Sequence, residues 1–198
     1  MKSTDMKFWD SRYRIGKTPW DFGGVPIALI RWLATASPGR ALIPASGSGY
    51  EVREFHARGW DVWAVDYSPA ANERARRVLG TLAERIVLAD FFTHDFSGQK
   101  FDVVYERTFL CSLPPEVWPQ YVQRVAELLV SGGRLVGFFL YGHEDEPPPY
   151  PLTESEAQAL FGANFTRILD EAVTDSLPLF AGRERWQIWQ KKAEGHRP

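Results

Sequence analysis

The residues most suited to chemistry form a glycine-rich segment, Pro44-Ala45-Ser46-Gly47-Ser48-Gly49-Tyr50, between an apolar run and a helix-length stretch. Gly47 and Gly49 permit a backbone with positive φ and let a ligand approach the main chain closely. The N-terminus of the following helix would offer unpaired N–H groups to a polar or negatively charged ligand. Taken alone, this spacing is a weak signal, because a tight strand-to-helix turn that binds nothing is the alternative.

Acidic residues follow the next two apolar runs. Asp66 ends the second run, where its carboxylate can accept hydrogen bonds from both hydroxyl groups of a ribose. Asp90 and Phe91 follow the third run and would offer adenine an acceptor and a ring, although a turn aspartate beside core rings is the alternative. Together these residues predict a nucleoside pocket. Val52 stands where the dinucleotide fingerprint has a third small residue, which disfavours NAD.

The order of elements from Arg40 onward indicates how these residues are positioned. Apolar runs alternate with amphipathic stretches, which predicts the α/β class, a mostly parallel sheet with helices on both faces. The carboxyl ends of parallel strands then lie at one edge of the sheet. The pattern predicts strands at 41–44, 61–65, 85–89, 101–105 and 135–140, helices at 50–58, 70–79, 115–130 and 153–161, a loop at 142–151, and an antiparallel hairpin from 165–173 and 186–189.

Residues 1–39 differ from the rest of the chain because they are rich in aromatic residues and glycine. We expect this segment, the N-terminal cover, to lie over the carboxyl ends of the strands. Aromatic rings there would attract a cationic ligand by up to about 2 kcal/mol when desolvated, whereas Trp32 is expected only to pack. Residues 1–198 are predicted to form one domain, with 191–198 as a frayed tail.

Composition limits the possible partners. The formal net charge of −2, with 44% hydrophobic and 24% charged residues, disfavours a nucleic-acid clamp and a membrane surface. The single cysteine, Cys111, can form neither an internal disulfide nor a cysteine-based metal site. We therefore expect a cytoplasmic protein, a monomer, with a small-molecule partner and no metal.

Several motifs together resemble one enzyme family. They are Phe8-Trp9 with Tyr13, 16–21, 43–50, 65–68, 90–92, 101–105 running on to 113–116, Pro148-Pro149-Tyr150 and 182–185. The chain is similar to the thiopurine S-methyltransferase-like class I methyltransferases, and more so to their thiol and halide methyltransferase arm. The resemblance implies a seven-stranded Rossmann-like sheet ending in a hairpin. It also implies S-adenosylmethionine (SAM) as cofactor and S-adenosylhomocysteine as product.

The same resemblance implies individual roles for residues of this chain. Phe22 and Tyr141 are expected to contact the methyl acceptor. Tyr13 stands where the family usually has Trp, and Ala45-Ser46 stands where this arm tends to have Gly-Cys. The implied cofactor contacts are Trp9, Tyr13 and Trp20 from the cover, Ala45 and Gly47 at the amino-acid moiety, Asp66 at the ribose, Asp90 and Phe91 at the adenine, and Arg107.

The predicted activity is SAM-dependent methyl transfer to a small soft nucleophile, foremost a thiol. A thiol needs no catalytic base if it arrives ionised, because its pKa is near 8.5. For an amine or hydroxyl acceptor, the candidate bases are Glu106, His143 and Asp145. Cys111 is expected to be a packed core thiol. Two alternatives stay open: an NAD-dependent oxidoreductase, which shares the glycine turn and Asp66, and a catalytically silent SAM-binding module.

Overall fold

The computed structural model describes residues 5–180 and 182–193, and its centre is a seven-stranded sheet in the order β3-β2-β1-β4-β5-β7-β6. The first five strands run parallel, and β7 pairs antiparallel with both β5 and β6. The predicted fold class and C-terminal hairpin are therefore confirmed. The strands are β1 (Arg40–Pro44), β2 (Asp61–Asp66), β3 (Ile86–Leu88), β4 (Phe101–Arg107), β5 (Leu129–Leu140), β6 (Phe165–Ala172) and β7 (Glu184–Lys191).

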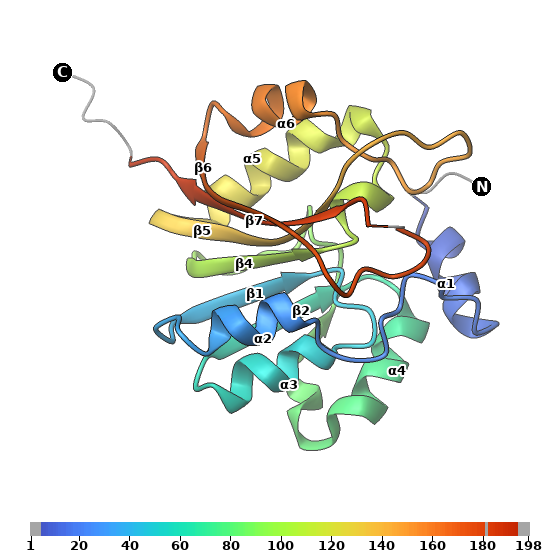
Figure 1. Cartoon of the computed structure of the whole chain (residues 1–198). Coiled ribbons are helices and arrows are strands. Elements are labelled where there is room, and N and C mark those ends of the chain that lie inside the picture. The colour runs from blue at the N-terminus through green and yellow to red at the C-terminus, as the bar shows by residue number, and fades with distance from the viewer. Residues whose placement is uncertain (1–4, 181, 194–198) are drawn as a thin grey trace.

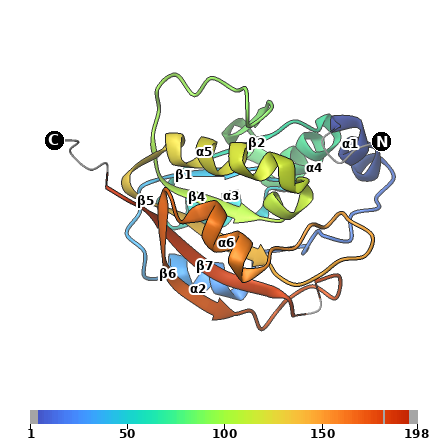
Figure 2. The same ribbon diagram turned by 90° about the horizontal axis from the view of Figure 1, so that it is seen from above.

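Helices cover both faces of the sheet (Figures 1 and 2). One face carries α2 (Ile27–Leu33), α3 (Tyr50–Ala57) and α4 (Pro69–Leu79), and the other carries α5 (Trp118–Leu128) and α6 (Glu154–Phe161). Helix α1 (Met6–Arg14) lies beyond the strand ends, on the same side as the long loop between β5 and α6. Short 3-10 helices are η1 (Gly80–Arg85), η2 (Leu110–Ser112) and η3 (Pro115–Val117).

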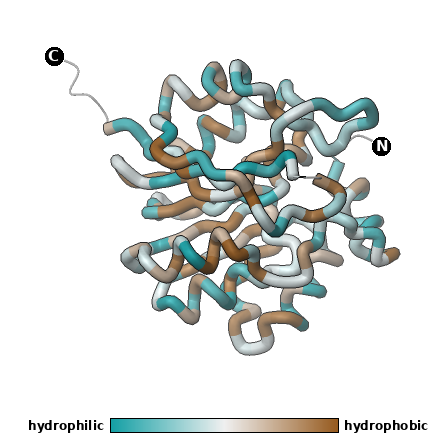
Figure 3. Tube along the Cα trace, viewed as in Figure 1, coloured by the Kyte–Doolittle hydropathy of each residue, from teal (hydrophilic) through white to brown (hydrophobic). Residues whose placement is uncertain are grey.

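Successive side chains along a strand pack into two separate hydrophobic cores, one on each face of the sheet. In β1, Ala41 and Ile43 pack toward α2 and α3, whereas Leu42 packs toward α5. This period of two follows from the pleat, which points successive side chains to opposite faces. Figure 3 shows the hydrophobic residues concentrated along the central strands and the hydrophilic ones toward outer loops. Buried apolar side chains on both faces hold the strand ends that carry the site in fixed positions.

Local helix signals in the sequence act as expected. Ser68 caps α4 by accepting the N–H of Ala71, with Pro69 in the first turn. Thr153 and Glu156 form a reciprocal capping box at the start of α6. These caps satisfy backbone donors that would otherwise be unpaired, so they fix where the two helices begin.

The predicted helix 115–130 is wrong at both ends. The α-helix starts at Trp118, after a separate 3-10 turn, and β5 begins directly at Leu129. Gly132 and Gly133 do not stop a helix but lie inside the strand, where Gly132 has a φ of 73°. A Cβ on Gly133 would come within 3.2 Å of the Asp102 carbonyl oxygen, so glycine allows the close approach of β4.

The N-terminal cover is divided between two positions. Helix α1 and the segment after it lie at the carboxyl ends of the strands, as expected. The expectation is wrong for α2, whose Leu29 and Leu33 are buried on a face of the sheet. Trp32 packs against Phe55, Trp60 and Trp186, in agreement with its expected packing role. The predicted frayed tail is partly wrong, since β7 runs to Lys191, and 194–198 lie outside the described residues.

Candidate active site

The glycine turn joins β1 to α3, and every second residue in it has a left-handed backbone. Ala45, Gly47 and Gly49 have φ values of 48°, 54° and 72°. The positive φ favours glycine at position 49, and a Cβ there would also crowd the Ile86 side chain at 3.0 Å. Thr108, after β4, has a φ of 59° and faces the turn across the site. Non-glycine residues in this conformation are uncommon, and such strain concentrates at functional sites.

Two carboxylates fasten the cover to this edge of the sheet. Asp10 of α1 accepts hydrogen bonds from Ser68 Oγ at 2.9 Å and from the Ala70 N–H at 2.8 Å, at the N-terminus of α4. Asp21 accepts from Ser48 Oγ at 2.6 Å and pairs with Arg74 at 2.9 Å. The hydrogen bond from Ser48 to Asp21 links the cover directly to the glycine turn. These charge-assisted bonds place the aromatic residues of the cover over the strand ends.

Two neighbouring cavities open between the cover and the turn. The larger, of about 450 Å³, is mainly apolar and reaches from α1 to the loop after β5. The smaller, of about 50 Å³, lies against the glycine turn and the end of β4. Tyr13, Trp20, Ala45 and Thr108 line both. We call them the acceptor-side cavity and the turn cavity.

Aromatic side chains separate the two cavities. The indole Nε1–H of Trp20 points to the hydroxyl of Tyr13 at 3.3 Å, and Trp9 stacks edge-on against Trp20 at 5.1 Å. A Cβ on Gly47 would lie 2.6 Å from the Tyr13 hydroxyl, so the tyrosine rests on the glycine turn. Trp9, Tyr13 and Trp20 therefore lie together at the acceptor-side cavity, and their contact with the cofactor stays a prediction. Their ring faces and edges suit a sulfonium cation held between the cavities.

Asp66 lies at the base of the acceptor-side cavity, at the end of β2. One carboxylate oxygen accepts the Gly47 N–H at 3.0 Å, and the other accepts the Ser68 N–H at 2.9 Å. Burial raises the pKa of Asp66 to about 6, and the two amide bonds oppose that rise. Each oxygen keeps a lone pair for a ribose hydroxyl, so Asp66 both holds the turn and fits its expected role.

The turn cavity is polar on its inner side. The guanidinium carbon of Arg107 lies 4.7 Å from the ring centroids of both Phe22 and Phe138. Arg107, Phe22 and Gly47 all line this cavity, beside the buried carboxylate of Glu51. Phe22 therefore contacts the cofactor-side arginine rather than the acceptor-side cavity. Its expected contact with the acceptor is not supported by this position.

Asp90 and Phe91 are not brought to either cavity. The Asp90 side chain is exposed and accepts the N–H of Phe92 at 2.8 Å. Phe91 is buried against Phe109 and Tyr121. The alternative of a turn aspartate beside core rings describes this geometry, and their contact with adenine stays a prediction. Tyr67, which follows Asp66 directly, lines the acceptor-side cavity instead.

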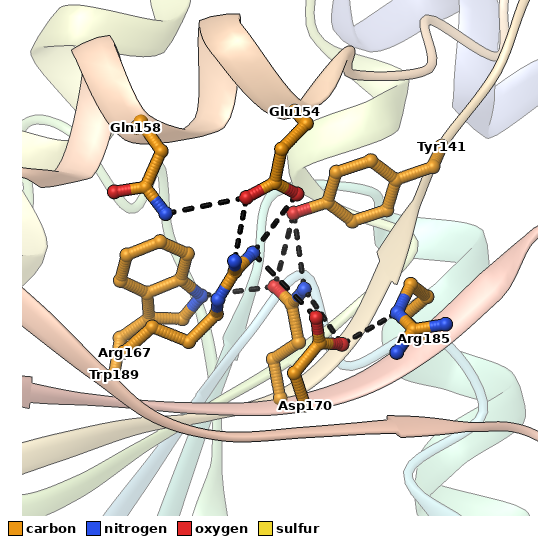
Figure 4. A network of polar contacts seen from close by, with 8 residues as sticks. Tyr141, Glu154, Gln158, Arg167, Asp170, Arg185 and Trp189 are labelled. Atoms are coloured by element: carbon orange, nitrogen blue, oxygen red, sulfur yellow. Dashed lines mark hydrogen bonds and ion pairs between the residues drawn. The ribbon is translucent and has the colours of Figure 1, made fainter.

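Tyr141 also lies away from both cavities. Its hydroxyl bonds to the side chain of Gln187 on β7, within a polar network that joins β6, β7 and α6 (Figure 4). In this network, Asp170 accepts hydrogen bonds from the side chains of Arg185 and Gln187. Arg167 forms an ion pair with Glu154. The hydroxyl is thus engaged in holding the C-terminal hairpin. The expectation that Tyr141 contacts the acceptor is not supported by this placement.

None of the three candidate bases lines the acceptor-side cavity. Glu106 is buried, and its carboxylate accepts the N–H groups of Phe109 and Leu110 and the hydroxyl of Tyr121. Burial raises the pKa of Glu106 to about 7. His143 is 86% exposed and faces Asp145 at 3.0 Å. Glu106 therefore shapes the turn after β4, and the other two belong to a solvated loop.

Sequence reasoning missed several lining residues. Cys111, expected as a core thiol, is only partly buried and lines the acceptor-side cavity. Its pKa is raised by desolvation and by Glu106 and Glu184, so the thiol stays protonated. Glu51 could have been noticed as an acid in the first turn after the glycines, although helix-dipole stabilisation explains such an acid equally well. Among the missed residues are Ser46, Glu51, Tyr67, Tyr105, Thr108, Cys111 and Glu146.

In residues 5–180 and 182–193, no group of three or more histidine, cysteine or acidic side chains is placed to hold a metal ion. In the same residues, no helix has the length and apolar character needed to cross a membrane.

Comparison with solved structures first defines the class. The fold matches that of 1,6-didemethyltoxoflavin-N1-methyltransferase from Burkholderia thailandensis, solved with S-adenosylhomocysteine, with a TM-score of 0.73, 21% identity, and coverage of 94% of this chain and 87% of that one. The sheet order and the glycine turn thus define a class I SAM-dependent methyltransferase fold.

Sequence comparison then defines the family. The family model for thiopurine S-methyltransferase (TPMT) matches residues 4–192, and the chain belongs to this family. Probable thiol methyltransferase 2 of Arabidopsis thaliana is 30% identical, over 95% of this chain and 86% of the relative. Thiocyanate methyltransferase 1 of Brassica oleracea is 26% identical, over 92% and 84%. The protein is a SAM-dependent methyltransferase, so NAD is not its cofactor.

The residues present fit this cofactor. Ser46 Oγ, Tyr105 Oη and Arg107 Nη1 are buried polar atoms without a hydrogen-bond partner among the described residues, and all three residues line the turn cavity. Unpaired buried groups of this kind are costly, and their convergence on one cavity indicates a polar ligand group. On the other side of the aromatic wall, Asp66 offers acceptors where a ribose would lie. When bound, SAM supplies a methyl group activated on a sulfonium.

Proposed function

We propose that the protein methylates the sulfur of a small thiol that enters the acceptor-side cavity as a thiolate. The names of its relatives support sulfur-containing acceptors, since they include a probable thiol and a thiocyanate methyltransferase. The cavity lining also suits a compact apolar molecule. Its walls include Phe8, Phe109, Phe180 and prolines 147–149.

The observation that carries this proposal is that none of the three candidate bases, Glu106, His143 and Asp145, lines the acceptor-side cavity. Of the two carboxylates that do line it, Asp66 accepts two backbone N–H groups and is expected to bind the ribose, and Glu146 is exposed on the loop after β5. An amine or hydroxyl would need a proton acceptor within hydrogen-bond reach, whereas a thiolate is already a nucleophile. Protonated Cys111 does not compete with it for the methyl group, because the thiolate and not the thiol attacks.

The residues of the site would act by placement and by excluding water. Trp9, Tyr13 and Trp20 screen the reacting centre from solvent and attract positive charge through their rings. Prolines 147–149 close the opposite side of the acceptor-side cavity. Fixing the nucleophile in line with the bond that breaks can supply much of the acceleration without proton transfer.

The test is methyl transfer to matched acceptors, with release of S-adenosylhomocysteine measured by mass spectrometry. Thiophenol and phenol form one pair, and hydrosulfide, thiocyanate and iodide are assayed beside them. We expect thiophenol to be methylated and phenol not, with a rate whose pH dependence follows the pKa of the acceptor thiol. If S-adenosylhomocysteine binds but no thiol is methylated up to pH 9, the chain is a silent binding module and the proposal fails.

We also propose that residues 1–198 act as one domain, as a cytoplasmic monomer with a small-molecule acceptor and no nucleic-acid partner. The acidic balance of charge and the single cysteine support this view. Light scattering coupled to size-exclusion chromatography would measure the mass in solution. A mass of two or more chains would contradict the monomer.

A further inference from the structure

Two cations line the acceptor-side cavity on the side of helix α1. They are Arg12, within the helix, and Lys17, just beyond its end. Neither side chain forms an ion pair with any residue in 5–180 or 182–193. By contrast, Arg14 of the same helix pairs with Asp10 at 2.7 Å. The residue roles described so far therefore leave two positive charges at this cavity without a function.

The guanidinium of Arg12 is held in a defined position. Its central carbon lies 3.5 Å from the centroid of the Phe8 ring, and Nη1 donates to the Phe8 carbonyl oxygen at 2.9 Å. The ring of Trp9 lies 6.0 Å away. The other N–H groups of Arg12 have no partner among the described residues. An arginine that stacks on a ring presents a preorganised set of donors, which suits a planar anion such as a carboxylate.

The negative charges at this cavity lie on other elements. Asp66, at the end of β2, accepts the N–H groups of Gly47 and Ser68. Glu146 is exposed on the loop after β5, and it too has no ion pair in the described part of the chain. The lining is otherwise mainly apolar. An anionic group on a ligand would therefore be attracted to the α1 side of the cavity and repelled by Glu146.

We propose that Arg12 and Lys17 select an organic thiol that carries an acidic group apart from its sulfur. Arg12 donates to the acidic group, and exposed Lys17 adds attraction at the cavity opening. The thiolate sulfur forms the new bond to the methyl group, whose bond to the sulfonium breaks and leaves its electron pair on the departing sulfur. The acidic group keeps its charge throughout. This inference rests on the proposed function. Hydrosulfide and iodide have no such group, so the two cations distinguish an acidic thiol from them.

Removing the Arg12 charge should change the choice of acceptor and not methyl transfer in general. For Arg12→Gln, we expect kcat/KM with 3-mercaptopropionate to fall by about 5- to 20-fold through a higher KM, because a charge-assisted hydrogen bond is lost. With 2-mercaptoethanol, which has no acidic group, kcat/KM should stay within about twofold. Arg12→Lys should keep part of the preference, since it retains the charge without the fork. Lys17→Gln should cost about 2- to 3-fold, because exposed ion pairs are weak.

The experiment measures release of S-adenosylhomocysteine with short thiols that differ in charge: 3-mercaptopropionate, 2-mercaptoethanesulfonate, 2-mercaptoethanol and cysteamine. Each kcat/KM is expressed per thiolate, because the thiols differ in pKa. We expect the parent to prefer the two acids and to use cysteamine least. Arg14→Gln is the matched control, since Arg14 lies on the same helix, is exposed and does not line the cavity. It should leave the preference unchanged.

Several results would overturn this inference, and each has a different meaning. If the parent uses acidic and neutral thiols equally, the cations do not select the acceptor, although the proposed function stands. If Arg12→Gln slows every thiol by the same factor, Arg12 only supports α1 through its contact with Phe8. If Arg14→Gln lowers the preference as much as Arg12→Gln, net charge and not contact is responsible. If the parent binds S-adenosylhomocysteine but methylates no thiol, the proposed function fails, and this inference fails with it.

Discussion

Asp66 gives the sharpest test of the site, because it is buried, ionisable and hydrogen-bonded to the glycine turn. Its pKa is raised to about 6 in the ligand-free protein. A ribose hydroxyl donates to the ionised carboxylate and loses that acceptor when the carboxylate is protonated. The affinity for S-adenosylhomocysteine should therefore be constant above pH 7 and fall as the pH drops below 6.

The size of this effect follows from the ionised fraction. At pH 6 half of Asp66 is protonated, which raises the apparent Kd about twofold, and at pH 5 only about a tenth is ionised, which raises it about tenfold. Asp66→Asn should lose this pH dependence and bind about 10- to 100-fold more weakly at pH 7.

The variant should still fold, because two effects on stability oppose each other. Removing the buried charge relieves about 3 kcal/mol at neutral pH, since each pKa unit is worth about 1.4 kcal/mol. The asparagine has a single carbonyl oxygen, so the N–H of Gly47 or of Ser68 loses its acceptor, at a cost of about 1–3 kcal/mol. The net change in unfolding free energy is small, so a loss of affinity would report on binding.

Titration calorimetry at pH 5, 6, 7 and 8 makes this measurement. The same series on Glu51→Gln separates the contribution of Asp66 to the pH dependence of binding from that of Glu51, a second buried carboxylate whose pKa is also raised. A parent Kd that stays constant from pH 5 to 7, or an Asp66→Asn variant with the parent affinity at pH 7, would refute the assignment of Asp66 to the ribose.

Four further substitutions test other parts of the structure. Glu106→Gln should flatten the pH dependence of the unfolding free energy measured by denaturant unfolding. In the parent, this carboxyl group lowers the unfolding free energy by up to about 3 kcal/mol as the pH rises from about 4.5 to 7, because burial raises its pKa and the unfolded chain releases the proton first. Trp20→Ala should weaken S-adenosylhomocysteine by about 3- to 30-fold in calorimetry through the lost ring contact, with little change in thermal unfolding. His143→Ala should keep kcat/KM within about twofold, since the ring is solvated; a tenfold loss would restore it as a base. Tyr141→Phe should lower the midpoint of thermal unfolding by about 2–4 °C through the bond lost to Gln187, with the acceptor KM unchanged; a rise in that KM would return Tyr141 to the acceptor site.

Some parts of the fold could be predicted because their causes are local. The caps at Ser68 and Thr153 each depend on a few neighbouring residues, so the sequence places both helix starts. The strand β5 could not be predicted in full, because its first half meets β4 only at Leu129, with a register shift before the continuous pairing that starts at Arg134. A glycine pair after an amphipathic stretch commonly ends a helix. Only the neighbouring strand shows that Gly133 instead allows the backbone of β4 to come close.

The candidate site likewise has some residues whose position the sequence predicts and others whose position depends on tertiary packing. The residues of the glycine turn and Asp66 act at strand ends, whose meeting point follows from parallel topology, so the sequence suffices to bring them together. Phe91 and Tyr141 lie near the same edge, but their side chains turn into the core and into the hairpin network. A position in the chain does not determine this direction, which depends on packing neighbours from other elements.

The sequence by itself therefore determined the order of elements, the turn and the family, because these rest on periodicity, glycine positions and contiguous motifs. Only the tertiary structure decided that two cavities lie on either side of Tyr13 and Trp20, and that Glu51 faces Arg107 without pairing. Glu51 and Arg107 lie on α3 and β4, and the cover comes from the start of the chain. Burial and charge pairing are properties of the assembled elements, so no local pattern in the sequence encodes them.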